Sequence, residues 1–188
     1  MSAVPALAPI VEALVEAGVP HMLAGSLASG VHGIARTTAD VDLVVELDDE
    51  RLARLVESLD PERFYVPVDT ARRAVVERSS FNVIDTEHGW KVDLIVRRDR
   101  PFSISEFARR ERVTVSGVDL FVATAEDTIL AKLEWARLGS SDRQVDDVVG
   151  ILRVRTDLDD QYLDRWAPEL GVQDLLAGAR RQASTGST

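Results

Sequence analysis

The pattern of apolar and polar positions predicts alternating helices and strands over residues 1–123. Apolar residues recur at helical spacing in four stretches, which cover 5–18, 27–32, 49–58 and 69–78. Short apolar runs between turn residues predict strands at 21–24, 40–47, 81–85, 91–96, 113–115 and 120–122. The last four of these runs lie close together in pairs, so each pair is expected to form a hairpin.

From Thr124 onward the spacing is helical and no strand is predicted. Thr124 with Asp127, and Ser141 with Gln144, have the spacing of residues that cap helix N-termini. Residues 160–182 are expected to form one or two more helices. The end of the chain therefore differs in architecture from its beginning.

The length and composition fit a compact protein with a packed core. The chain has 188 residues, of which 45% are hydrophobic and 29% are charged. We therefore expect an α/β (α+β) fold in which a small mixed β-sheet flanked by helices occupies 1–123. A helical C-terminal region would pack on this core over 124–183, and 184–188 would form a disordered tail.

The composition also excludes some kinds of chemistry and indicates a cellular compartment. There is no cysteine, which excludes disulfides, thiolate metal sites and a cysteine nucleophile. The three histidines, His21, His32 and His88, lack the spacing of a zinc site. The N-terminal stretch lacks the basic leader of a signal peptide, and no apolar run is long enough to cross a membrane. A cytoplasmic protein with no membrane partner is expected.

The charge is strongly negative overall but unevenly distributed. The formal net charge of −10 disfavours broad binding to nucleic acids. Six arginines nevertheless fall within one short stretch: Arg97, Arg98, Arg100, Arg109, Arg110 and Arg112. A salt-bridged surface and a patch that faces a polyanion explain this stretch equally well. The chain has two lysines, Lys91 and Lys132, among 22 basic residues, a weak indication that these positions need an ammonium.

Two aspartates, Asp40 and Asp42, begin the strand predicted at 40–47. Residues i and i+2 of a strand point to the same face, so the two carboxylates repel each other unless a cation lies between them. Mg²⁺ suits such a site, because it prefers oxygen ligands and binds substrate phosphates at the same time. The alternative is an edge strand with an exposed acidic face, since Asp-x-Asp is a common pattern by itself.

Two further features accompany these carboxylates. Gly25 and Ser26 fall where a short strand ends and a helix begins, and the N–H groups of a helix N-terminus bind phosphate. Asp93 lies inside the apolar run 91–96, where a carboxylate is costly without a partner. If its strand lies beside that of the first two aspartates, it could ligate a metal and accept a proton. The alternative for Asp93 is an ion pair with Lys91 or an arginine.

The order of these residues resembles the nucleotidyltransferase superfamily typified by DNA polymerase beta. The pattern of that family is Gly-Ser or Gly-Gly, a spacer, Asp-x-Asp and a third acidic residue on a later strand. Here it reads Gly25-Ser26, thirteen residues, Asp40-Val41-Asp42 and then Asp93, with a spacer slightly longer than the commonest one. The resemblance covers about the first half of the chain, and the combination is far more specific than any of its parts.

The resemblance implies a magnesium-dependent nucleotidyltransferase whose catalytic core is the sheet region. Asp40, Asp42 and Asp93 would bind two Mg²⁺ ions, with Asp93 also acting as general base. Gly25 and Ser26 would bind a nucleoside triphosphate such as ATP. An acceptor hydroxyl would attack the α-phosphate and release pyrophosphate, a reaction that depends mainly on charge neutralisation and positioning.

The helical region resembles the toxin-type branch of this superfamily, which belongs to abortive-infection and toxin–antitoxin systems. The similar segments are 124–135 and 141–147. In that branch a helix lysine contacts the triphosphate and an acidic residue on the next helix supports the site. Lys132 and Asp147 match these positions, with Asp146 as the alternative to Asp147. The alternative for Lys132 is a surface lysine paired with a nearby acidic residue. Arg36 and Thr38, just before the aspartate strand, are further candidates for binding the nucleotide.

Several functions stay open from the sequence. The acceptor could be a tRNA, a protein hydroxyl or a small molecule, and a toxin-type enzyme could have an antitoxin partner. An antibiotic-modifying enzyme, similar to the lincosamide or aminoglycoside nucleotidyltransferases, would need a deep acidic pocket. A non-catalytic nucleotide-binding module would be expected to lack at least one metal-binding carboxylate, whereas all three are present. Structural aspartates in an ordinary α/β protein are the remaining alternative.

Overall fold

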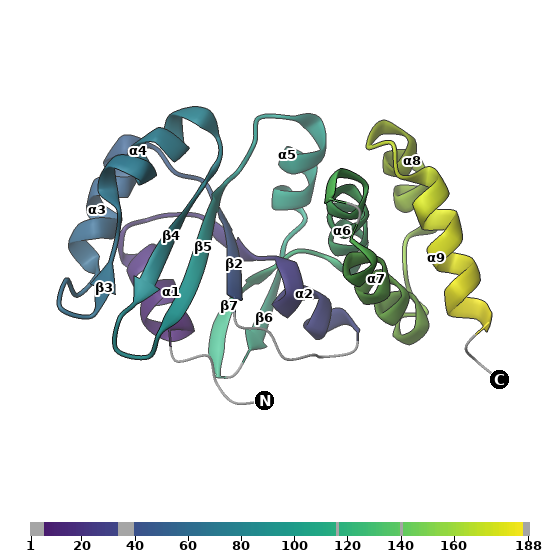
Figure 1. Ribbon diagram of the computed structural model, residues 1–188, viewed down its shortest axis with the longest axis horizontal. Helices are drawn as coiled ribbons and strands as arrows, with labels where there is room; N and C mark the ends of the chain where they lie inside the picture. The colour runs from purple at the N-terminus through teal and green to yellow at the C-terminus, as the bar shows by residue number, and fades with distance from the viewer. Residues whose placement is uncertain (1–5, 34–39, 116, 140, 186–188) are drawn as a thin grey trace. The chain divides into compact units, whose positions relative to one another are not determined.

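The structure, a computed structural model, describes residues 6–33, 40–115, 117–139 and 141–185. The chain divides into two compact units, Met1–Ala24 with Thr38–Val122 and Gly25–Thr37 with Ala123–Thr188. All the described strands belong to the first unit, and the second is helical. The expected α/β class with a mixed sheet is confirmed (Figure 1).

A mixed sheet, with seven strands among the described residues, forms the centre of the first unit. The strands are β1 (His21–Leu23), β2 (Asp40–Val45), β3 (Phe64–Tyr65), β4 (Ser80–Asp85), β5 (Trp90–Val96), β6 (Glu111–Val115) and β7 (Val118–Val122). Their spatial order is β3-β4-β5-β2-β1-β7-β6. β2 pairs with β5 and β1 with β7 in parallel, whereas the other neighbours are antiparallel. Both predicted hairpins, β4–β5 and β6–β7, are confirmed.

Burial alternates along the central strands, so one face of the sheet is closed and the other is more open. Val41, Leu43 and Val45 of β2 are fully buried, whereas the residues between them are partly exposed. β4 and β5 follow a similar alternation. Burying each large apolar side chain contributes about 1.5–3 kcal/mol. A slip of one residue would exchange the two faces and bury Asp42, so the apolar set fixes the register.

The described helices of the first unit are α1 (Leu7–Glu16), α3 (Asp49–Ser58), α4 (Val68–Glu77) and α5 (Pro101–Ala108). α1 buries Leu7, Ile10 and Leu14 and contacts α3 and β7, and α4 packs against α3 and β4 (Figure 1). The predictions of α1, α3 and α4 are confirmed. The sequence did not predict α5 or the two-residue strand β3. α5 begins at Pro101, whose fixed φ suits the first turn of a helix.

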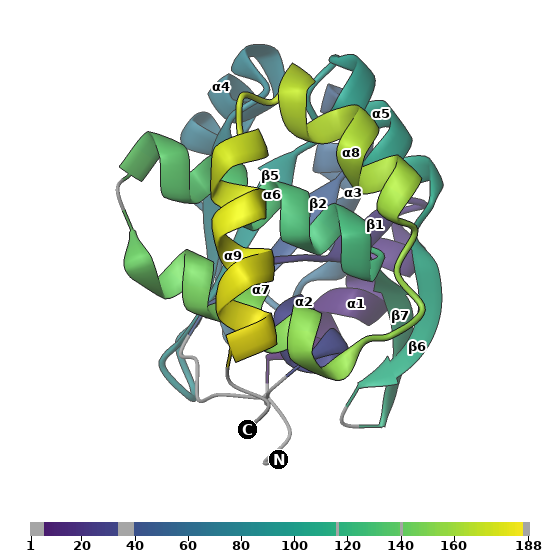
Figure 2. The ribbon, with the colours of Figure 1, turned by 90° about the vertical axis from the view of Figure 1, so that its right-hand side faces the viewer.

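The second unit contains, among the described residues, α2 (Gly25–His32), α6 (Ala125–Gly139), α7 (Asp142–Val154), α8 (Asp160–Glu169) and α9 (Gln173–Thr185). α7 packs against both α6 and α9, and Figure 2 shows α9 lying along α7. α8 and α9 agree with the prediction of one or two helices over residues 160–182. None of the helices in the described parts of the chain is long and apolar enough to cross a membrane.

The two predicted helix caps have different outcomes. The backbone N–H of Asp127 donates to Thr124 Oγ1 at 3.2 Å, so this cap is confirmed. Ser141 makes no side-chain cap, so the second prediction is wrong. Its expected partner, Gln144, instead accepts a hydrogen bond from Lys132 Nζ at 2.9 Å. A lysine from the preceding helix therefore binds the amide that the cap would have used.

The end of α2 is tied to the helical unit rather than to the sheet that flanks it in sequence. The His32 Nε2–H donates to the carbonyl oxygen of Ala123 at 2.6 Å. A Cβ atom on Gly33 would lie 2.9 Å from the backbone nitrogen of Ile151 in α7, so only glycine permits this approach. These contacts explain why the short helix belongs to the second unit although its neighbours along the chain belong to the first.

Candidate active site

The two strands that carry the predicted carboxylates are neighbours. β2 and β5 pair in parallel, with Asp42 opposite Asp93 and Asp40 opposite Lys91. Residues paired in a ladder lie on the same face of the sheet, and positions i and i+2 share that face. The three carboxylates and the Lys91 side chain therefore project from one face. The opposite orientation of Asp93 would have excluded a shared site.

The Lys91 ammonium lies among these carboxylates. Its Nζ is 3.2 Å from Asp93 Oδ2 and 3.8 Å from Asp40 Oδ1. The hydrogen bond to Asp93 holds the pKa of Lys91 above its ordinary value, against the opposing effect of partial burial, and the charges of Asp40 and Asp42 add to the rise. The ion pair between Asp93 and Lys91, expected as the alternative to a metal site, is thus present on the same face as the carboxylates. The side chain of Lys91 is 44% exposed, so solvent reaches the group.

The chemistry of this group fits a divalent cation such as Mg²⁺. The carboxylates offer only oxygen ligands, which Mg²⁺ prefers. Asp93 Oδ1 is buried and has no hydrogen-bond partner within the part of the chain that the structure describes. An unsatisfied buried carboxylate oxygen costs free energy, which a metal ion would recover.

Gly25 and Ser26 are the first residues of α2, in the helical unit. The residue before them, Ala24, donates its backbone N–H to the carbonyl oxygen of Asp42 at 2.9 Å. Gly25 has a φ of 60°, a left-handed conformation that costs other residues about 1–2 kcal/mol. The chain thus leaves the sheet beside the aspartate strand and begins the predicted helix N-terminus at a position that favours glycine.

Lys132 of α6 and Asp147 of α7 form an ion pair, with Nζ 2.7 Å from Oδ2. The two side chains are 5% and 7% exposed, so the interpretation of Lys132 as a surface lysine is wrong. Gln144 accepts a hydrogen bond from the same ammonium. The contact of Lys132 with a triphosphate, which the resemblance implies, stays a prediction. Arg36 and Thr38, the other nucleotide-binding candidates, lie outside the described residues.

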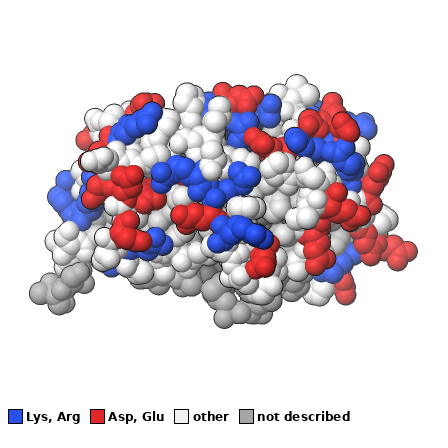
Figure 3. Space-filling view, turned by 180° about the vertical axis from the view of Figure 1, so that it is seen from behind, with Lys and Arg blue, Asp and Glu red and all other residues white. Residues whose placement is uncertain are grey.

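Several arginines of the stretch 97–112 make contacts within the first unit. Arg97 is 14% exposed and donates from Nε to Glu46 Oε1 at 2.8 Å. The guanidinium of Arg110 lies over the ring of Phe121. Figure 3 shows Lys and Arg side chains interspersed with Asp and Glu side chains on one face of the molecule. Arg97 is thus salt-bridged, as the first interpretation requires, whereas Arg98 and Arg112 are exposed.

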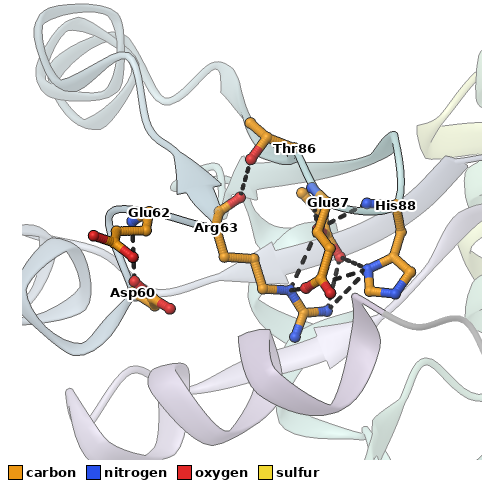
Figure 4. Close-up of polar contacts among 7 residues, drawn as sticks. Asp60, Glu62, Arg63, Thr86, Glu87 and His88 are labelled. Carbon is orange, nitrogen blue, oxygen red and sulfur yellow. Dashed lines mark hydrogen bonds and ion pairs between the residues drawn. The ribbon is translucent and has the colours of Figure 1, made fainter.

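A second group of possible metal ligands, which the sequence did not single out, lies where β4 ends and the turn to β5 begins. Asp85, Glu87 and His88 each offer a ligand atom, and these atoms lie within 4.8 Å of one another. The side chain of Arg63 reaches this turn (Figure 4), and its Nη2 is 2.8 Å from Oδ2 of the buried Asp85. This hydrogen bond lowers the pKa of Asp85. We interpret the group as an ion-paired support of the turn, because the guanidinium already supplies the positive charge.

Comparison with known proteins identifies the fold. No protein-family model matches the chain, and no curated protein matches it in sequence. An antigenic nucleotidyltransferase-like protein from Paracoccidioides brasiliensis shares 18% sequence identity over 92% of this chain and 89% of its own, with a TM-score of 0.54. ANT(2")-Ia in complex with adenylyl-2"-tobramycin shares 14% identity over 96% of this chain and 95% of its own, with a TM-score of 0.47. The chain therefore has a nucleotidyltransferase-like fold.

Proposed function

We propose that this chain is a magnesium-dependent nucleotidyltransferase, which transfers a nucleoside monophosphate from a nucleoside triphosphate to an acceptor hydroxyl. The observation that carries the proposal is the register of β2 and β5, with Asp42 opposite Asp93 and Asp40 on the same face. The nucleotidyltransferase-like fold supports it. The buried Asp93 oxygen, without a hydrogen-bond partner in the described residues, is an atom of the kind that a metal ion satisfies.

The three carboxylates divide the chemical work. Asp40, Asp42 and Asp93 would hold two Mg²⁺ ions, which supply charge neutralisation at the phosphates. The acceptor oxygen forms a bond to the α-phosphorus, while the bond from this phosphorus to the oxygen that bridges to the β-phosphate breaks. The electron pair of the broken bond leaves with pyrophosphate. Asp93 accepts the proton of the acceptor hydroxyl.

The N-terminus of α2 is the proposed binding element for the triphosphate. A helix N-terminus attracts phosphate through its backbone N–H groups and the positive end of its dipole. Gly25, which has no Cβ, allows a ligand to approach the backbone closely, and Ser26 adds a hydroxyl. For Lys132 and Asp147 we propose a supporting role in the helical unit, because their ion pair is buried.

A protein hydroxyl or a small molecule is the acceptor that the charge distribution favours. The net charge of −10 disfavours a tRNA. Arg97 and Arg110, which could have faced a polyanion, contact groups of the first unit instead. A toxin-type enzyme that modifies a protein and an antibiotic-modifying enzyme are the two forms of the proposal that agree with this charge.

The test is incubation with Mg²⁺ and each labelled nucleoside triphosphate, in the presence of total RNA or cell extract. Label should move to protein or to a small molecule, and label on RNA would overturn the proposed acceptor. Asp42→Ala should lower the rate by about a thousandfold or more, because it removes a metal ligand. Glu111→Ala, which changes an exposed acidic residue on the edge strand β6, is the matched control. Unchanged transfer by Asp42→Ala would contradict the proposed function.

A further inference from the structure

A lysine occupies the fourth position of the ladder that holds the three proposed metal ligands. Lys91 lies opposite Asp40, and Asp93 lies opposite Asp42, all on one face of the sheet. We propose that Lys91 is a built-in counter-cation of these carboxylates, which a divalent metal ion displaces when it binds. This inference rests on the proposed function and assigns Lys91 a role in setting the affinity of the site for metal.

The geometry gives the ammonium and a metal ion the same carboxylates. Nζ lies 3.2 Å from Asp93 Oδ2 and 3.8 Å from Asp40 Oδ1, so it bridges the two strands as a cation would. Mg²⁺ binds carboxylate oxygens at about 2.0–2.1 Å. An ammonium and a metal ion on the same carboxylates would lie a few ångströms apart and compete for the same negative charge. Binding of the ion therefore weakens the attraction between the carboxylates and the ammonium and favours its release into water.

The environment of Lys91 permits this exchange. Its side chain is 44% exposed, and its flexible stem lets the ammonium move into water with little loss of packing. Asp40 is 57% exposed, so an ion can reach the carboxylates from the same side. A monovalent ion brings no more charge than the tethered ammonium that it would replace. A divalent ion does, and so the exchange favours divalent ions.

Lysine NMR tests the exchange in the unmodified protein. The chain has two lysines, so protein labelled with ¹³C at lysine Cε should show two lysine signals. Saturating Mg²⁺ should shift the signal of Lys91, whose ammonium is released. The signal of Lys132, buried against Asp147, should stay in place and serves as the internal control. An unmoved Lys91 signal at a Mg²⁺ concentration that saturates the site would overturn the inference.

Substitution of Lys91 gives an independent test by titration calorimetry with Mn²⁺ alone. Lys91→Met should bind Mn²⁺ roughly threefold to tenfold more tightly than the unmodified protein, because the competing cation is gone. Lys91→Arg keeps the charge and should change the affinity by about twofold or less. Arg51→Met removes a comparable cation on α3, whose Nη1 lies 3.3 Å from Oδ2 of the N-cap residue Asp48, and should leave the affinity unchanged. Equal affinities of Lys91→Met and the unmodified protein would overturn the inference.

The same titrations separate this inference from the proposed function. If the unmodified protein binds Mn²⁺ and Asp42→Ala does not, but Lys91→Met binds no more tightly, the metal site stands and the role of Lys91 is wrong. If the folded unmodified protein and Lys91→Met both fail to bind Mn²⁺, the metal site itself is wrong. A purely structural role of Lys91 would lower stability on substitution without raising the affinity for metal.

Discussion

The two lysines of the chain form ion pairs of opposite character. In the helical unit, the Lys132 and Asp147 side chains are 5% and 7% exposed, with Nζ and Oδ2 2.7 Å apart. In the sheet unit, the Lys91 side chain is 44% exposed, and its ammonium is shared between Asp93 at 3.2 Å and Asp40 at 3.8 Å. The first pair is closed to water, whereas the second is partly open to it.

This difference separates a fixed ion pair from an exchangeable one. Removing one partner of a buried pair is costly, because the other charge stays in a medium that solvates it poorly. An exposed pair is screened by water, and its contribution is about 0–1 kcal/mol. The same two residue types can therefore hold helices together in one place and give way to a ligand in another.

Lys132→Met tests the closed pair and should have the largest effect on stability. It leaves the Asp147 carboxylate without this ammonium and should lower the free energy of unfolding by about 3–5 kcal/mol. Lys91→Met, measured with saturating Mg²⁺, should lower it by about 1 kcal/mol or less. Denaturant unfolding checks both values. Similar losses in the two variants would contradict the distinction between the pairs.

Asp85→Asn tests a third pair, that of Arg63 with Asp85. Its carboxylate is buried, like that of the Lys132–Asp147 pair. Asp85 is fully buried and Arg63 is 25% exposed, so the loss should be intermediate, about 2 kcal/mol at neutral pH. Arg63 lowers the pKa of Asp85 in the folded protein. The contribution of the pair to stability is therefore fully present above the pKa of the unfolded chain, near 3.9, and is lost as the pH falls through the lower pKa of the folded protein.

The matched control for Asp85→Asn is Asp164→Asn, which breaks the exposed pair between Asp164 and Arg180. It should change the free energy of unfolding by less than about 1 kcal/mol. A loss for Asp85→Asn as small as this control would show that burial of the carboxylate does not decide the strength of these pairs.

Protonation of His21 should have the smallest effect on stability. Because this effect appears below pH 6.5, the two lysine pairs should be compared above that pH. Burial lowers the pKa of His21, so the folded state holds a neutral imidazole. The unfolded chain takes up a proton near pH 6.5, and stability should fall by about 1 kcal/mol or less as the pH drops below this value. His21→Gln should remove this part of the loss between pH 7 and 5.5 in unfolding measurements. An identical pH dependence in both proteins would contradict it.

Much of the sheet and its carboxylates followed from local patterns. The β-branched run that contains Asp42 predicted β2, and the two apolar runs around a turn predicted the hairpin of β4 and β5. The sequence did not predict that β2 pairs with β5, although the metal site depended on this pairing. More than forty residues and two helices separate Asp42 from Asp93 along the chain. Spacing within a strand gives the face of a side chain, whereas the neighbour of that strand depends on the whole sheet.

The closed pairs were harder to predict, since they depend on packing between helices and turns. Local spacing could not distinguish a surface position of Lys132 from a position in a binding site. In the structure α7 packs against its helix and supplies Asp147 as its ion-pair partner. Gln144 was expected to cap its own helix, and it binds Lys132 instead. Arg63 and Asp85 are 22 residues apart and meet only because β3 pairs with β4. No short pattern contains these partners together.

The most direct test is diffraction from crystals soaked in Mn²⁺, recorded at the manganese absorption edge. We predict an anomalous peak about 2.0–2.3 Å from carboxylate oxygens of Asp42 and Asp93, with the Lys91 ammonium no longer bonded to Asp93. No peak beside these carboxylates, or a peak confined to the turn that carries Asp85 and His88, would contradict a metal centre on β2 and β5.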